Sequence, residues 1–150
     1  MLPLRAHELL SLELLLAGPE SPLAVLRTQA EKVGVSRRTY NSFGEYVDFV
    51  VPPAAERAIP SNLILGDIEL NVTGVSHPVT VLLYIENGLL SHLEFSTIEG
   101  DWPEELSIES AYYLREVPSG QQSFALEPVQ FRHPTTLARA LAGRGTPSAA

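Results

Sequence analysis

The sequence predicts an α+β domain, in which an N-terminal helical pair packs on one face of a mostly antiparallel, meander-like sheet of five or six strands. Three observations lead to this prediction. The length of 150 residues suits one domain with a single core. Residues 4–33 are rich in leucine at helical spacing. Beyond them, short runs of β-branched and aromatic residues alternate with turn residues, which is the pattern of strands.

Two short helices are expected first. Residues 4–16 are dominated by leucine and contain no β-branched residue, which favours a helix. The Gly-Pro pair at 18–19 ends it. Ser21 and Pro22 suit an N-cap and a first helical position, so the second helix is expected from Pro22 to about Lys32.

Strands follow the helices. Residues 33–40 and 45–51 predict a hairpin, and the prolines at 52–53 end its second strand. Residues 63–75 predict another strand, broken or bulged at Gly66.

Asp48 lies within an otherwise apolar strand. A carboxylate there must face solvent or have a partner, because burying an unpaired charge is costly. The simplest expectation is that Asp48 faces solvent and pairs with Arg37 or Arg38 across the hairpin.

Residues 79–96 carry the best local signal, a hairpin around Asn87 and Gly88. A three-residue loop with Gly88 left-handed would place Ile85 opposite Leu89. This register makes one face almost wholly apolar, which favours it because a one-residue slip exchanges the faces. The other face would then carry a mixed set of side chains: Thr80, Leu82, Tyr84, Leu90, His92 and Glu94.

The C-terminal third is less decided by pattern. Residues 104–117 fit either a last strand or part of a helix. From position 118 onward Pro, Ser, Gly, Gln and Ala dominate, so we expect a domain over residues 1–117 and a poorly ordered tail over 118–150. Residues 135–141 are expected to form a short helix after Pro134.

Charge and composition exclude several classes. The formal net charge is −8, and an acidic body of this kind repels nucleic acid while attracting a basic partner. The absence of cysteine excludes disulfides and thiol chemistry. Charged residues interrupt every apolar run, so we expect a cytoplasmic protein that does not enter a membrane.

No motif for chemistry stands out. The sequence holds no HExxH, GxSxG, GxGxxG or phosphate-binding GxxxxGK[ST] pattern. His92 and Glu94 would share a strand face, but two ligands do not make a metal site. We therefore assign no catalytic, cofactor-binding or metal-binding residue, and expect a protein that is not an enzyme.

The least ordinary feature is an acidic stretch around a tryptophan. No Lys or Arg interrupts residues 93–114, and Trp102 stands among the acids. An aromatic anchor surrounded by carboxylates suits a basic partner, whereas a Trp102 packed into the core would leave only a solvated loop. The candidate partner-binding residues are Glu94, Glu99, Asp101, Trp102, Glu104 and Glu105.

Several segments together resemble a group of small uncharacterised bacterial proteins. The matching segments are residues 44–49 (GEYVDF), 66–68 (GDI), 83–95 (LYIENGLLSHLEF) and the Trp-Pro pair at 102–103. In that group of proteins the position of Val47 is a threonine, and the position of Asn87 is often an aspartate. The resemblance implies no catalytic residue. Some small acidic proteins of this kind resemble immunity proteins of bacterial toxin systems.

Three functional hypotheses follow. The first is a non-enzymatic binding protein, such as an immunity-type inhibitor of a basic partner. The second is a small-molecule-binding protein or hydrolase with a pocket near Tyr84, His92 and Glu94. The third is a homodimer that buries the mixed face of the sheet. A closed pocket with converging polar groups would favour the second.

Overall fold

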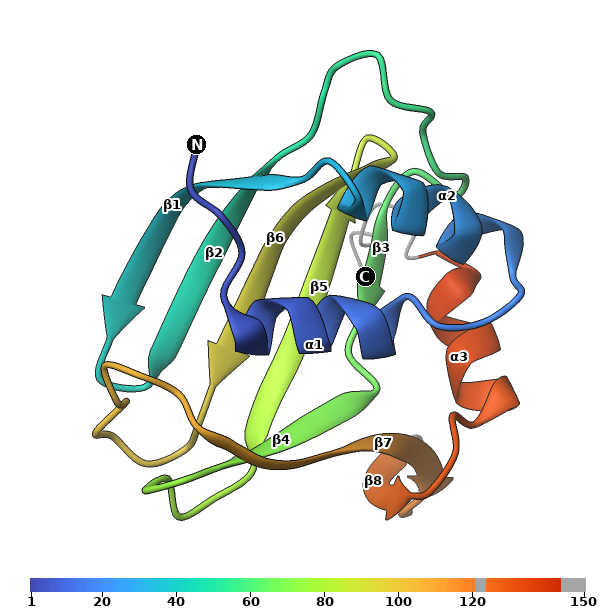
Figure 1. Ribbon diagram of the computed structural model, residues 1–150. Helices are drawn as coiled ribbons and strands as arrows, with labels where there is room; N and C mark the ends of the chain where they lie inside the picture. The colour runs from blue at the N-terminus through green and yellow to red at the C-terminus, as the bar shows by residue number, and fades with distance from the viewer. Residues whose placement is uncertain (121–123, 144–150) are drawn as a thin grey trace.

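The computed structural model describes residues 1–120 and 124–143 (Figure 1). Within these residues the chain forms three helices: α1 (Ala6–Leu15), α2 (Ser21–Ala30) and α3 (Pro134–Leu141). The strands are β1 (Gly34–Asn41), β2 (Gly44–Val50), β3 (Leu63–Leu65), β4 (Ile68–Val72), β5 (Val79–Glu86), β6 (Leu89–Ser96), β7 (Ile108–Pro118) and β8 (Phe124–Val129). The α+β class is confirmed, and the eight strands exceed the five or six expected.

All eight strands belong to one antiparallel sheet in the order β1-β2-β6-β5-β4-β7-β8, with β3 also paired to β5. β3 and β4 lie along the same edge of β5, one after the other. The predicted break at Gly66 separates them. A Cβ at Gly66 would lie 2.4 Å from a methyl group of Leu82, so glycine allows the chain to pass close to β5 here.

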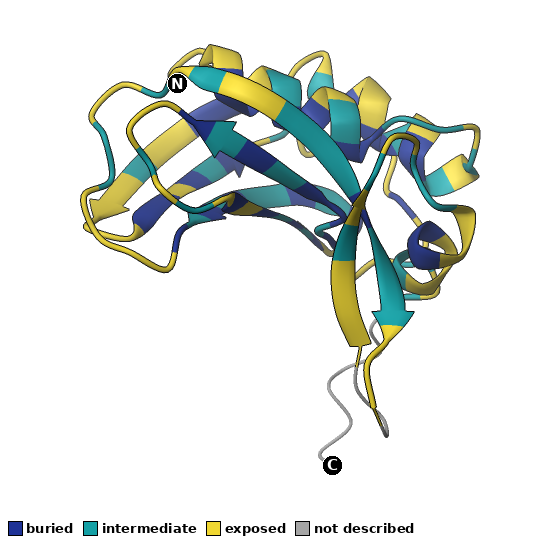
Figure 2. Cartoon of the chain, turned by 90° about the horizontal axis from the view of Figure 1, so that it is seen from below, coloured by how far each residue is buried: buried dark blue, intermediate teal, exposed yellow. Residues whose placement is uncertain are grey.

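The helices cover one face of the sheet. α1 lies across its middle and α2 above it, while α3 packs beside β3 (Figure 1). Alternate β5 residues, such as Val81 and Leu83, point into the core with Leu15, Leu23 and Leu26 of the helices. The other face of β2, β6 and β5 has no helix over it, and the β7–β8 hairpin projects on that side (Figure 2). None of the helices in the described ranges is long and apolar enough to cross a membrane.

The predicted register of the β5–β6 hairpin is wrong near its turn. The turn has two central residues, Asn87 and Gly88, both with positive φ, and Ile85 pairs with Leu90 rather than Leu89. A bulge at Ser91 then shifts the register by one residue. The apolar side chains of β6 beyond the bulge therefore still face the core, and Leu90, expected on the mixed face, is buried.

The C-terminal prediction is corrected for the residues that the structure describes. Most of residues 104–117 belong to strand β7, which settles the choice between strand and helix. Strand β8 pairs with the C-terminal half of β7. The short helix after Pro134 is confirmed as α3, whose Leu137 joins the hydrophobic core. The prediction of a poorly ordered tail depended on the lack of a long periodic apolar pattern after residue 118. Such a pattern is not needed here, because β8 is held by its backbone pairing with β7. Residues 121–123 and 144–150 lie outside the described residues.

Candidate functional site

Glu94 lies on the face of the sheet that the helices leave uncovered. Strand register places Tyr46 and Leu82 directly on either side of it. One carboxylate oxygen accepts a hydrogen bond from the Tyr46 hydroxyl and the other from the Tyr84 hydroxyl, each over 3.4 Å. The charge of Glu94 raises the pKa of Tyr46. Both hydrogen bonds are long, so the carboxylate is oriented by the two tyrosines and only weakly satisfied by them.

The next row across the same face contains a stacked pair. His92 lies opposite Tyr84, with ring centroids 4.2 Å apart and planes inclined by 14°. On the other side His92 pairs with Asp48, whose carboxylate accepts a hydrogen bond from Arg37 Nε at 3.3 Å. The expectation that Asp48 faces solvent and pairs with Arg37 is confirmed. The row stiffens the surface around Glu94, because stacked rings restrict each other's rotamers.

Glu94 differs from its acidic neighbours in its partners. Asp48 is paired with Arg37, and Glu69 accepts a hydrogen bond of 2.9 Å from Tyr112. Burial, and then that bond, raises the pKa of Tyr112 to about 12. Glu94 makes no ion pair with any residue in the described part of the chain. Its charge is therefore left without a cationic partner among the described residues, so a cation from outside could pair with it.

The structure places Tyr84, His92 and Glu94 on one face of the sheet, the face without a helix, and each of them is half-buried there. Four hollows formed by described residues are each lined by other side chains and by none of these three. An enclosed pocket around them, which the small-molecule hypothesis requires, is not among those hollows.

The other acidic candidates are spread over different surfaces. Glu99 is exposed and bonds to Ser76 and His77, which lower its pKa. Glu104 and Glu105 are exposed beside a hollow next to α1, on the helical side of the sheet. Asp101 is also exposed, with a φ of 71°. These acids do not form one patch with Glu94.

Trp102 is half-buried and is not a free anchor. Its ring packs against the hydrophobic core, and its backbone N–H donates to the Ser42 carbonyl at 3.1 Å. The indole nitrogen is buried without an acceptor among the described residues. Trp102 thus fastens the loop after β6 to the turn between β1 and β2, which is a structural task.

A buried ionic cluster lies under the N-terminal end of α1. Arg38 of β1 holds both carboxylate oxygens of Glu8, at 2.8 and 2.7 Å, and the Arg5 backbone N–H donates to the same group at 2.8 Å. Burial favours a higher pKa for Glu8, but the bonds from Arg38 and Arg5 outweigh it, so its pKa is lowered. Glu8 thereby joins α1 to the edge of the sheet.

The same cluster contains His7 and Glu45, which hydrogen-bond to each other. One ligand atom each of His7, Glu8 and Glu45 lie within 4.8 Å of one another, a spacing that a metal ion could use. The guanidinium of Arg38 already neutralises Glu8, and His7 hydrogen-bonds to one carboxylate oxygen of Glu45. The other oxygen of Glu45, Oε2, is buried without a hydrogen-bond partner among the described residues, so these contacts leave one polar atom of the cluster unsatisfied.

Sequence reasoning did not single out this cluster. A signal was available in β1, where Arg37 and Arg38 are adjacent and must point to opposite faces. One of the two had to point towards the helices, and a buried arginine requires an acidic partner. The partner, Glu8, could not be chosen from sequence among the acids of the first helix.

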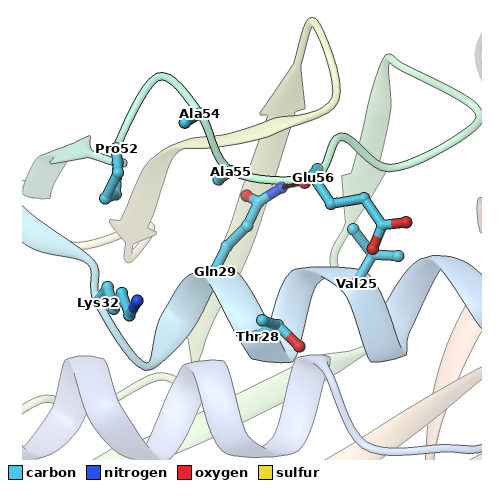
Figure 3. Close-up of a pocket in the computed structure, with 8 residues that line it drawn as sticks. All are labelled: Val25, Thr28, Gln29, Lys32, Pro52, Ala54, Ala55 and Glu56. Atoms are coloured by element: carbon cyan, nitrogen blue, oxygen red, sulfur yellow. Dashed lines mark hydrogen bonds between the residues drawn. The ribbon is translucent and has the colours of Figure 1, made fainter.

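A hollow of about 220 Å³ lies between α2 and residues 52–56. Figure 3 shows the side chains that line it. Gln29 points into this region, but its amide is already engaged. Its nitrogen donates to the carbonyls of Glu56 and Gly88, both at 2.8 Å, and its oxygen accepts from Leu90 N at 2.9 Å. Gln29 therefore holds the loop and the β5–β6 turn on α2, and offers little to a ligand.

Comparison with known proteins adds no relative. No family model, curated protein or solved structure matches the chain. The resemblance to small bacterial proteins stays a prediction.

Proposed function

We propose that this protein is a non-enzymatic binding protein that recognises a basic partner protein through the uncovered face of its sheet. The observation that carries the proposal is Glu94, a carboxylate held between Tyr46 and Tyr84 without an ion pair in the described part of the chain. An exposed aromatic ring and a carboxylate together suit a guanidinium, which pairs with the carboxylate and packs against the ring.

The overall charge favours a basic protein over a second copy of the chain. With a net charge of −8, two copies would repel each other, whereas a basic partner would be attracted over distances of about 10 Å at moderate salt. Glu104 and Glu105, on another surface, would contribute to this attraction without touching the partner at Glu94. The homodimer hypothesis is therefore less favoured.

An immunity-type inhibitor would be one form of such a protein. It would cover a basic surface of a toxin with its acidic one, as the sequence resemblance implies. A small-molecule binder or hydrolase is less favoured, because Tyr84, His92 and Glu94 line none of the four hollows described above.

The direct test uses a fluorescein-labelled hexa-arginine peptide and fluorescence anisotropy. Glu94→Gln is expected to weaken binding by about tenfold, because a carboxylate–guanidinium contact is lost. The matched control is Glu31→Gln, which removes the same charge at an exposed position at the end of α2, on the helical side. It should change affinity by less than about twofold.

Two outcomes would contradict the proposal. One is the absence of binding by the wild-type protein at low salt. The other is an equal effect of both substitutions, which would mean that the peptide senses only net charge.

A further inference from the structure

A hollow of about 370 Å³ lies next to the row that contains Glu94. Leu82 forms part of its wall and is also the direct cross-strand neighbour of Glu94. Ile64, another wall residue, pairs with Tyr84 on the same side. Because Leu82 and Ile64 both line the hollow and adjoin the row of Glu94, the hollow continues the surface around Glu94 and is not a separate site.

The charged groups that line the hollow are already paired. Glu116 forms an ion pair with Arg139 at 2.8 Å, and its backbone N–H donates to Thr136 at 3.0 Å. Asp67 is bound by Arg132. No described carboxylate or guanidinium there is left unpaired, so a charged group from outside would gain little by entering.

The apolar wall is in part open to solvent. Leu126 of β8 is 56% exposed, although it lines the hollow together with Ile64 and Leu82. An apolar side chain that entered would cover these three residues and remove their surface from water. The hollow therefore suits an aliphatic side chain, in contrast to the carboxylate beside it.

We infer that the partner contributes an extended segment with a basic side chain on Glu94 and an aliphatic side chain two positions away in the hollow. This inference rests on the proposed function. Leu82 lies on the strand next to that of Glu94, and Ile64 lies one strand further. Because adjacent strands are about 4.8 Å apart, the hollow begins about 5–10 Å from Glu94. Side chains at positions i and i+2 of an extended segment point the same way and lie about 6.7 Å apart, which matches that separation.

The test uses three synthetic peptides with glycine–serine flanks, titrated into ¹⁵N-labelled protein and followed by NMR. Their central sequences are Arg-Gly-Leu, Arg-Gly-Asn and Arg-Leu-Gly. We expect Arg-Gly-Leu to bind about tenfold more tightly than either of the others, because only it can bury its leucine while its arginine stays on Glu94.

Substitutions locate the effect. Leu126→Ser should abolish the advantage of Arg-Gly-Leu and leave the affinity for Arg-Gly-Asn unchanged. Ile98→Ser, which removes an even more exposed apolar residue from the loop after β6, should alter neither affinity.

The outcomes separate the two proposals. If Glu94→Gln weakens all three peptides but the leucine gives no advantage, or Leu126→Ser leaves that advantage intact, the two-point inference is overturned and the basic-partner function stands. If no peptide responds to Glu94→Gln, both are overturned.

Discussion

Arg132 binds Asp67 through two parallel hydrogen bonds of 2.9 Å, one from Nε and one from Nη2. Its remaining nitrogen, Nη1, donates to three carbonyls at the end of α1, those of Leu14, Leu15 and Ala17. A single side chain from the segment between β8 and α3 thus closes the C-terminal end of α1 and holds the break between β3 and β4. A cation in this position also suits the helix dipole.

Arg132→Met is therefore expected to destabilise the protein by about 3–5 kcal/mol, because Asp67 would remain buried without a partner. The measurement is urea denaturation. Arg139→Met is the control: its ion pair with Glu116 is partly exposed and its guanidinium also lies over the Phe124 ring, so the loss should be about 1–2 kcal/mol, below that of Arg132→Met. Similar losses for both variants would mean that the segment is not anchored by Arg132.

Arg38 offers a second comparison, with its own neighbour. Arg38→Leu should cost about 3–5 kcal/mol, since it leaves the buried Glu8 carboxylate uncompensated. Arg37→Leu, which breaks an exposed pair with Asp48, should cost less than about 1 kcal/mol. Removing both charges in the double variant Glu8→Leu/Arg38→Leu should restore part of the loss, and a fully additive result would argue against a coupled pair.

Acid should weaken the contribution of Glu8. Its pKa is lower in the folded chain than in the unfolded one, so the stabilisation is present above the unfolded value and is lost as pH falls through the folded value. The free energy of unfolding of Glu8→Gln should lie below that of the wild type at about pH 7, and the gap should narrow towards about pH 3. A gap that stayed constant or widened in acid would contradict this assignment.

The β5–β6 turn depends on Gly88 for two reasons. Its φ is +76°, and a Cβ there would lie 2.6 Å from Arg57 Cβ and 2.9 Å from the Ala58 carbonyl oxygen. Gly88→Val should thus cost more than about 2 kcal/mol. Gly74 has a similar φ of +82° and nothing within 4 Å, so Gly74→Val measures the backbone cost alone. Equal effects in thermal or urea unfolding would show that the close approach is unimportant.

How far the sequence predicts the site can be seen at the hairpin. The common face of Tyr84, His92 and Glu94 was predicted correctly, although the register that supported it was wrong. The bulge at Ser91 compensates for the shorter turn, and such an insertion leaves no clear mark in a pattern of alternating residues. For Trp102 the sequence-based prediction was wrong. The acidic residues around it suggested a binding surface, but its ring packs against the hydrophobic core.

The sequence alone determined the elements whose signals are local. The helical pair, the break at Gly66, the solvent-facing Asp48 and the helix after Pro134 follow from residues within a few positions of one another. Tertiary structure alone decided the rest. Arg132 and Asp67 are 65 positions apart, and Arg38 and Glu8 are 30 apart. A charge finds its buried partner only when the packing of the core brings the two together, and no local period records that choice.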